Sequence, residues 1–120
     1  MQYMMLIHND EKLMAAMSDE TRVELVKQFG AYTESLKSSG QWLAGDRLFP
    51  NSAARTIRSK DGKPVVTDGP FAEVKEALGG YYIVEAKDID EAVAIASRVP
   101  SIAAGFGGVE VRPIMPMPRN

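Results

Sequence analysis

Two segments with helical spacing divide this chain into strand-like blocks, and their order constrains the fold more than any other feature. The first segment follows Ser18, carries apolar side chains at helical intervals and stops at Gly40, as helices often do. The second opens with the cap-like sequence DIDE and runs up to Pro100. Strand-like runs occupy 3–7, 41–48, 54–59, 64–67, 80–86 and 109–114. The order of elements is therefore β-α-β-β-β-β-α-β, a split βαβ pattern with an additional hairpin.

This pattern predicts an α+β domain with a ferredoxin-like antiparallel sheet and two helices on one face. The 120 residues contain no linker, repeat or low-complexity block, so we expect a single domain over 1–120. Because the helices cover only one face of the sheet, we expect a second subunit to cover the other face and form a homodimer.

The chain has no cysteine and only one histidine. It therefore cannot form disulfides, use a thiol nucleophile or bind an iron–sulfur cluster, and a zinc site built by the protein is not expected. An all-carboxylate Mg²⁺ or Ca²⁺ site stays open, although no loop has calcium-ligand spacing. No phosphate loop or dinucleotide fingerprint occurs either. The prediction is that the protein holds no metal and no cofactor.

The charge balance argues against two classes of partner. Fourteen basic and sixteen acidic side chains give a formal net charge of −2, so we expect no general attraction to nucleic acid or to an anionic membrane. The apolar start of MQYMMLIHND is too short for a signal peptide or a membrane span. Together with the lack of cysteine, which fits a reducing compartment, this predicts a cytoplasmic protein.

The stretch VTDGPFAE ends the fourth strand-like run and is unusual for a turn. Asp68 and Gly69 would normally predict a two-residue hairpin, but Pro70 has no backbone N–H for a returning strand. The sequence indicates a loop held in one shape, with Phe71 pinned against the core. Asp68 either caps this loop through an Asx-type bond or is presented to a cleft. The EVKE run at 73–76 is expected to form a solvated turn of helix.

The predicted catalytic residues are Asp68 and His8. Asp68 would be the base or ligand anchor, and His8 its proton partner, because histidine is the side chain that titrates near neutral pH by default. His8 ends a buried strand and shares a face with Met4 and Leu6, where a hydrogen-bonded structural role is the alternative. A general base must lie within hydrogen-bond reach of its proton, so the hypothesis requires a short distance between the two groups.

The predicted ligand-binding residues are Arg47, Arg58, Phe71 and Tyr82. Arginines beside strands can bind a carboxylate or a phosphate through two parallel hydrogen bonds. Tyr82 and Trp42 predict a flat aromatic surface, which is ordinarily core or interface and only secondarily a platform for a ligand.

The segment DGPFAEVKEALGGYYIVEA, with the opening YMMLIH and the closing VEVRPIM, resembles the YCII-related family in its DGPF branch from residue 2 to about 116. The motif itself maps to Asp68, Gly69, Pro70 and Phe71. The resemblance implies a ferredoxin-like fold that dimerises into an α/β-barrel-type assembly, with a cleft for a small molecule. Some relatives are attached to sigma factors of the extracytoplasmic-function class, which implies a regulatory context for part of the family.

The better-studied relatives carry a proposed His–Asp pair on and after the first helix. Aligning the helix ends at Gly40 places Phe29 and Ser38 near those positions, and neither side chain can move a proton as His or Asp would. The pair is therefore absent here. The sequence leaves two hypotheses: a homodimer with a cleft for a small polar metabolite near the DGPF loop, as binder or enzyme, or a non-catalytic regulatory module associated with a sigma factor.

Overall fold

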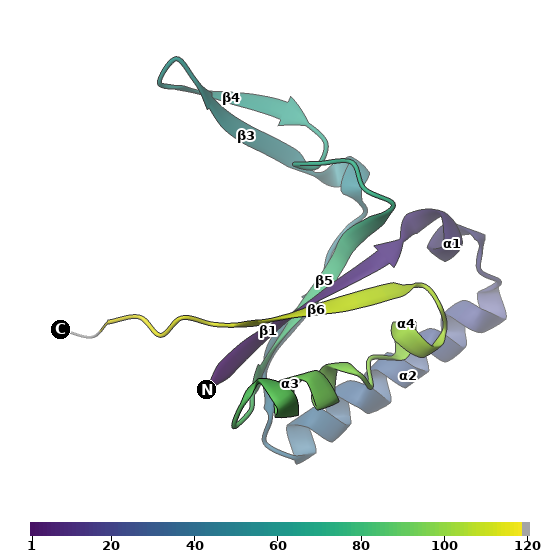
Figure 1. Cartoon of the computed structure of the whole chain (residues 1–120). Coiled ribbons are helices and arrows are strands. Elements are labelled where there is room, and N and C mark those ends of the chain that lie inside the picture. The colour runs from purple at the N-terminus through teal and green to yellow at the C-terminus, as the bar shows by residue number, and fades with distance from the viewer. Residues whose placement is uncertain (119–120) are drawn as a thin grey trace.

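The computed structural model describes residues 1–118 and contains a four-stranded antiparallel sheet (Figure 1). Its strands lie in the order β2 (Trp42–Arg47), β5 (Glu76–Glu85), β1 (Gln2–Asp10) and β6 (Gly107–Pro113). The expected α+β architecture with an antiparallel sheet is confirmed. The strand order is that of a split βαβ pattern and is consistent with a ferredoxin-like fold.

Two longer helices, α2 (Asp19–Ser38) and α3 (Ile89–Ala96), pack on one face of this sheet. Each begins at the cap that the sequence indicates, because the side chains of Ser18 and Asp88 accept hydrogen bonds from backbone N–H groups three residues on. Two short helices accompany them: α1 (Glu11–Ala16) follows β1 directly, and α4 (Pro100–Ala103) contacts both α2 and β6.

The core lies between the sheet and these helices. Alternate residues of β1, namely Tyr3, Met5 and Ile7, are buried against the helices, as the two-residue period of a strand requires. The buried Tyr32 hydroxyl of α2 donates a 2.7 Å hydrogen bond to the carbonyl of Ile95 in α3. Burial raises the pKa of Tyr32, so its hydroxyl stays protonated and this hydrogen bond links α2 to α3.

The opposite face of the sheet, called the open face below, lies away from α2 and α3. It carries the other set of alternating residues, as the strand registers show. These are Met4, Leu6, His8, Tyr81, Ile83, Glu110 and Arg112. The apolar ones among them are only half-buried, so a single chain leaves this face incompletely covered.

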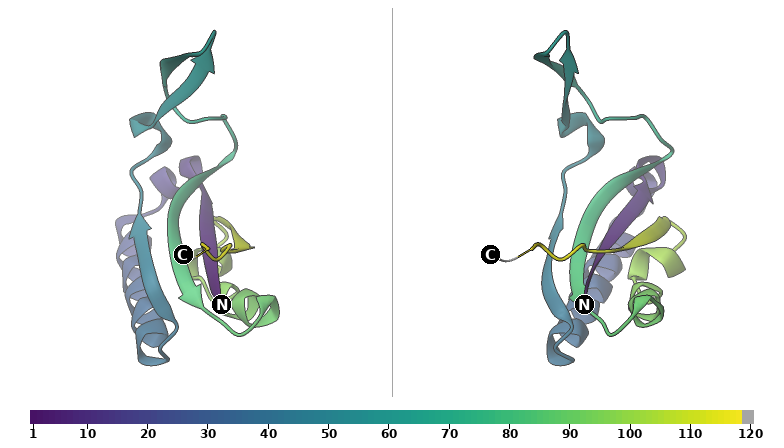
Figure 2. Two further views of the ribbon diagram at one scale, coloured as in Figure 1. Left: turned by 90° about the vertical axis from the view of Figure 1, so that its left-hand side faces the viewer. Right: turned by 60° about the vertical axis from the view of Figure 1, so that its left-hand side comes forward.

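A hairpin stands apart from the four-stranded sheet (Figures 1 and 2). It consists of β3 (Arg55–Lys60) and β4 (Lys63–Asp68), which turn through two residues of positive φ at 61–62, as an Asp-Gly turn predicts. We call this hairpin the arm; the 3₁₀ turn η1 (Asn51–Ala53) precedes it. The radius of gyration is 16.4 Å, whereas a compact domain of this length has about 14 Å. The arm and the extended C-terminal segment after β6 therefore project from the body.

Two details differ from the sequence prediction. The residues at 73–75 form no helical turn, because β5 begins at Glu76 and continues the sheet. Pro100 does not end α3, which stops at Ala96; it begins α4, where the missing N–H of proline costs nothing.

Within 1–118, no helix is long and apolar enough to cross a membrane.

Candidate functional site

A cavity of about 430 Å³ lies on the helix-covered side of the sheet, between α1, α2 and the strands β1, β2 and β5. This volume falls within the range of pockets that hold small molecules. Its wall is mostly apolar and includes a few polar groups. The lining residues are Ile7, Asn9, Met14, Met17, Arg22, Leu25, Val26, Phe29, Thr33, Trp42, Gly45, Asp46, Arg47, Gly79, Gly80 and Tyr82.

The helix α2 supplies one side of the cavity. Leu25, Phe29 and Thr33 recur every fourth residue along this helix, so they lie on one stripe that faces the sheet. Val26 lies beside this stripe and is 60% exposed. The sequence predicts the apolar face of α2. In the structure, part of this face lines the cavity and does not pack into the core.

An aromatic wall stands opposite. Tyr82 stacks on Tyr32 with 5.9 Å between ring centroids, and Trp42 meets Tyr82 edge-on at 5.0 Å. The Tyr82 hydroxyl also shares a 3.1 Å hydrogen bond with the Thr33 hydroxyl. Such edge and stacked geometries are the favourable ones for aromatic pairs. The rings are therefore held in place before any ligand arrives.

Three glycines keep the floor of the cavity low. A Cβ at Gly45 would lie 2.6 Å from both the Trp42 and the Tyr82 ring, and one at Gly80 would lie 2.9 Å from the Asp46 carbonyl oxygen. A Cβ at Gly79 would lie 2.8 Å from the Asn9 side-chain nitrogen. Distances below 3.0 Å exclude a side chain unless a neighbour moves. The Gly-Gly pair of the LGG sequence thus serves close backbone approach at this floor.

The polar residues of the lining include two arginines and an amide. Arg22 donates one 3.3 Å hydrogen bond from Nη2 to the Met14 carbonyl, and neither it nor Arg47 has a carboxylate within 4.0 Å among residues 1–118. The Oδ1 atom of Asn9 is buried without a hydrogen-bond partner in the same part of the chain. Buried polar atoms without a hydrogen-bond partner are uncommon in proteins, so the Asn9 oxygen calls for one.

Two of the predicted ligand-binding residues, Arg47 and Tyr82, line this cavity. Sequence reasoning missed Asn9, Arg22 and the glycine floor. The doubled glycine inside a strand was a signal for close backbone approach. Arg22 and Asn9 gave no local signal, because nothing in their neighbourhood distinguishes them from surface residues.

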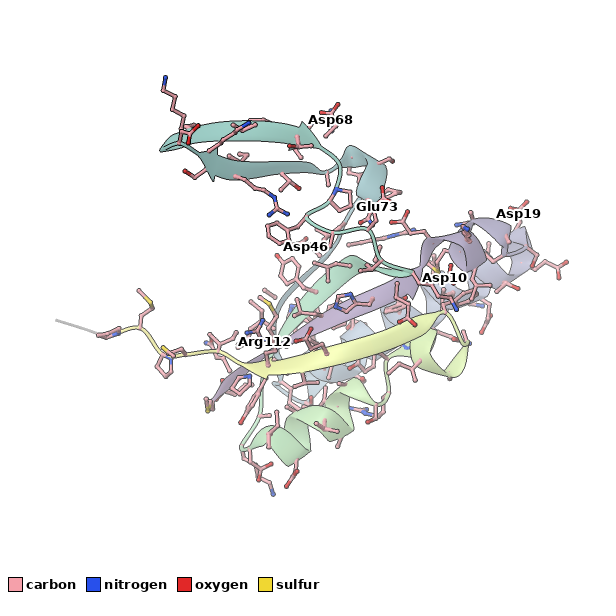
Figure 3. The ribbon with its side chains drawn as sticks, turned by 45° about the horizontal axis from the view of Figure 1, so that its top comes forward. Asp10, Asp19, Asp46, Asp68, Glu73 and Arg112 are labelled. Carbon is pink, nitrogen blue, oxygen red and sulfur yellow. The ribbon has the colours of Figure 1, made fainter. Side chains whose placement is uncertain are left out.

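Asp68 lies on the arm and does not line the cavity (Figure 3). Its side chain is 89% exposed and forms a 3.1 Å ion pair with Nε of Arg55, its cross-strand neighbour. The expected Asx bond is replaced by this pair, and the loop is held instead by backbone bonds of Gly69, including a 2.8 Å bond from its N–H to the Ala54 carbonyl.

Arg58 and Phe71 also lie outside the cavity lining. The Arg58 guanidinium lies 4.0 Å from the centroid of the Phe71 ring, and its Nη2 donates a 3.1 Å hydrogen bond to the Phe71 carbonyl. Phe71 remains 71% exposed, so it packs against Arg58 of the arm and is not pinned to the core as the sequence suggested.

His8 lies on the open face, with Nε2 3.8 Å from a carboxylate oxygen of Glu110. Its neighbours there are those expected from strand alternation. Within one chain, His8 and Asp68 therefore belong to different sheets and have different partners. Among residues 1–118, no cluster of three His, Asp or Glu side chains could hold a metal ion.

Comparisons with known proteins agree with this architecture. An uncharacterized protein of Rhizobium meliloti (R00369) is 35% identical over 114 residues, which cover 95% of this chain and 92% of the relative. A solved structure of a dehydrochlorinase from Burkholderia phenoliruptrix, 5-chloro-2-hydroxyhydroquinone dehydrochlorinase in complex with 2,5-dihydroxybenzoquinone, is similar with a TM-score of 0.55. At 19% identity, over 96% of this chain and 94% of that chain, this likeness concerns the fold alone.

The model of the YCII-related domain matches residues 1–118. It identifies the family as a whole, and the DGPF branch stays a prediction. With the family model and the Rhizobium relative both spanning nearly the whole sequence, the chain belongs to the YCII-related domain family.

Proposed function

We propose that this protein binds a small molecule in the cavity between α2 and the sheet. The observation that carries the proposal is the preformed shape of the cavity: fixed aromatic rings on one wall, an apolar helix face on the other, and a floor kept low by glycines. Such concave, mostly apolar pockets with a few converging polar groups are the usual sites of small ligands. The proposed site thus lies away from Asp68, contrary to the cleft expected near the DGPF loop.

The dehydrochlorinase with the similar fold was solved with a ring-shaped quinone, and this supports a ring-shaped ligand for the aromatic wall here. The geometry supports binding and assigns no reaction. A guanidinium group offers hydrogen-bond donors and no acceptor, so Arg22 and Arg47 can hold a ligand through donated hydrogen bonds.

Blocking the cavity with a single side chain tests the proposal. Val26 lines the cavity and is 60% exposed, while Val23, one turn earlier on α2, is 61% exposed and does not line it. Val26→Phe should therefore abolish binding, and the matched control Val23→Phe should preserve it. Both substitutions should leave folding intact, because both side chains are largely in solvent.

The measurement is a thermal-shift screen of a metabolite library at constant protein concentration. A ligand at a hundredfold excess over its Kd adds about 2.7 kcal/mol of apparent stability, which is about 10 °C for a chain of this length. Trp42, the only tryptophan, lies in the cavity wall, so its fluorescence reports binding directly. A hit that survives Val26→Phe unchanged would place the ligand elsewhere and refute the proposed site.

We also propose that the chain forms a homodimer through its open face and arm. Two features support this assembly: the half-covered apolar residues of the open face, and the arm, whose Ile57 and Val66 are 65% and 62% exposed. The open face carries both signs of charge, with Glu110 and Arg112 adjacent, as a self-complementary surface requires. Light scattering of the wild type should give a dimer mass and Ile57→Asp a monomer. The control Thr67→Asp, which by strand alternation lies on the other face of the arm, should give a dimer.

The regulatory alternative, a module that binds a sigma factor, is favoured by the same exposed apolar side chains of the arm. Hydrogen exchange distinguishes the two assemblies. In the homodimer, the arm amides are protected in the purified chain. In the regulatory module, the chain is monomeric and the arm becomes protected only when the sigma factor is added.

A further inference from the structure

We infer that the ligand of the cavity is an aromatic carboxylate, with its ring against the aromatic wall and its carboxylate held by Arg22 and Arg47. This inference rests on the proposed binding function and names the chemical class of the ligand. It combines three features of the cavity as residues 1–118 form it: two arginines without an acidic partner, the direction of Asp46, the one acid in the lining, and the rings and aliphatic side chains of the rest of the lining.

The positive charge is the first feature. Arg22 and Arg47 both border the cavity, and among the described residues no acid lies within 4.0 Å of either. Arg22 uses one of its five N–H donors on the Met14 carbonyl. The remaining donors of the two guanidiniums suit the planar, two-oxygen geometry of a carboxylate.

The direction of Asp46 is the second feature. Asp46 precedes Arg47 in β2, and consecutive residues of a strand point to opposite faces. The Asp46 carboxylate accepts a 2.8 Å hydrogen bond from the hydroxyl of Tyr81, its partner in the strand register. This bond raises the pKa of Tyr81 and keeps the carboxylate on the open face. Arg47 is therefore presented to the cavity side without its neighbour as a counter-ion.

The apolar part of the lining is the third feature. Beyond the arginines the lining consists of rings and aliphatic side chains, including Phe29, Trp42 and Leu25, which favour a flat apolar body. Near the floor, the unpartnered Oδ1 of Asn9 marks a hydrogen-bonding position beside Gly79. An aromatic ring with one carboxylate matches a lining that has both arginines and apolar side chains. A small, fully polar metabolite would leave the aromatic rings of the lining without a partner.

The test compares naphthoate with naphthamide, its neutral counterpart of nearly the same shape. Binding is followed by isothermal titration calorimetry. We expect naphthoate to bind about tenfold more tightly than naphthamide, since hydrogen bonds to a charged group are stronger than neutral ones. Arg47→Met and Arg22→Met should each remove most of this preference. Lys27→Met, which deletes a positive charge from the exposed side of α2 outside the cavity lining, should leave it unchanged.

The outcomes separate the inference from the function on which it rests. If both compounds bind equally, and Val26→Phe abolishes both, the cavity is a ligand site but its preference for an anion is refuted. If Lys27→Met weakens naphthoate as much as the arginine variants do, the effect is general charge attraction and the inference is also refuted. If neither compound binds and no library hit depends on Val26, the proposed function itself fails.

Discussion

Replacing a glycine by alanine should have opposite effects at two positions of this protein. Gly45 lies in β2 at the floor of the cavity, where an added Cβ would meet the Trp42 and Tyr82 rings at 2.6 Å and the Tyr81 carbonyl oxygen at 3.0 Å. Gly30 lies in the interior of α2 and is exposed, and apart from its chain neighbours and its own helix backbone no atom of residues 1–118 lies within 4 Å of its would-be Cβ. The same added methyl group thus enters a crowded floor in one case and solvent in the other.

The magnitudes follow from these surroundings. Overpacking of a well-packed site costs about 1–3 kcal/mol, so Gly45→Ala should lower the free energy of unfolding by this amount. Glycine in an exposed helix interior is about 1 kcal/mol worse than alanine, so Gly30→Ala should raise it. For about 120 residues, 1 kcal/mol corresponds to roughly 4 °C in Tm. The two variants should therefore melt about 8–16 °C apart.

Urea unfolding followed by circular dichroism measures both changes at constant protein concentration. Trp42 emission should shift in folded Gly45→Ala, because its ring has to move, and should stay unchanged in Gly30→Ala. If Gly45→Ala has wild-type stability and wild-type emission, the close packing of the cavity floor is refuted. If Gly30→Ala is destabilised instead, the assignment of that glycine to an unstrained, exposed helix position is wrong.

Three further predictions concern the body and the arm. Tyr32→Phe should cost about 1 kcal/mol in urea unfolding, because the Ile95 carbonyl keeps a second hydrogen bond to a backbone N–H. Burial raises the pKa of Tyr32 in the folded chain, so the Tyr32 hydroxyl loses its proton at lower pH in the unfolded chain than in the folded one. The free energy of unfolding therefore falls as pH rises above about 10. In a pH series of thermal melts, Tyr32→Phe should lose less stability than the wild type over this range. Asp68→Asn should change stability by less than about 1 kcal/mol, since its ion pair with Arg55 is exposed, and a thermal-shift titration should show unchanged ligand binding; lost binding would return Asp68 to the site. Ser18→Ala should cost about 1 kcal/mol through the lost cap of α2, measurable by the same urea titration, and an unchanged midpoint would contradict the capping role.

The glycines of the LGG sequence predict one feature of the structure and leave another open. A doubled glycine inside a strand indicates that something approaches the backbone closely. The sequence does not say what approaches. Only the register of β2 and β5, together with the position of Asn9, shows that the crowding at Gly79 and Gly80 forms the floor of a cavity.

The sequence by itself determined where several elements of this protein begin and turn. Ser18 and Asp88 cap their helices, and Asp61 and Gly62 turn the hairpin, through bonds and φ angles that involve neighbours within a few residues. The alternation along β1 likewise fixed that His8 shares a face with Met4 and Leu6. Local chemistry sufficed for these features because their partners lie close along the chain.

Only the tertiary structure decided which residues meet. Arg22 and Arg47 line one cavity, although one lies on a helix and the other on a strand. Asp68 lies on the arm and His8 lies on the open face, each with its own charged partner. A residue type signals which chemistry a side chain can perform, but not the direction in which it points or what the fold brings beside it. Those depend on strand register and helix packing between distant segments, and a pattern in a few neighbouring residues cannot encode them.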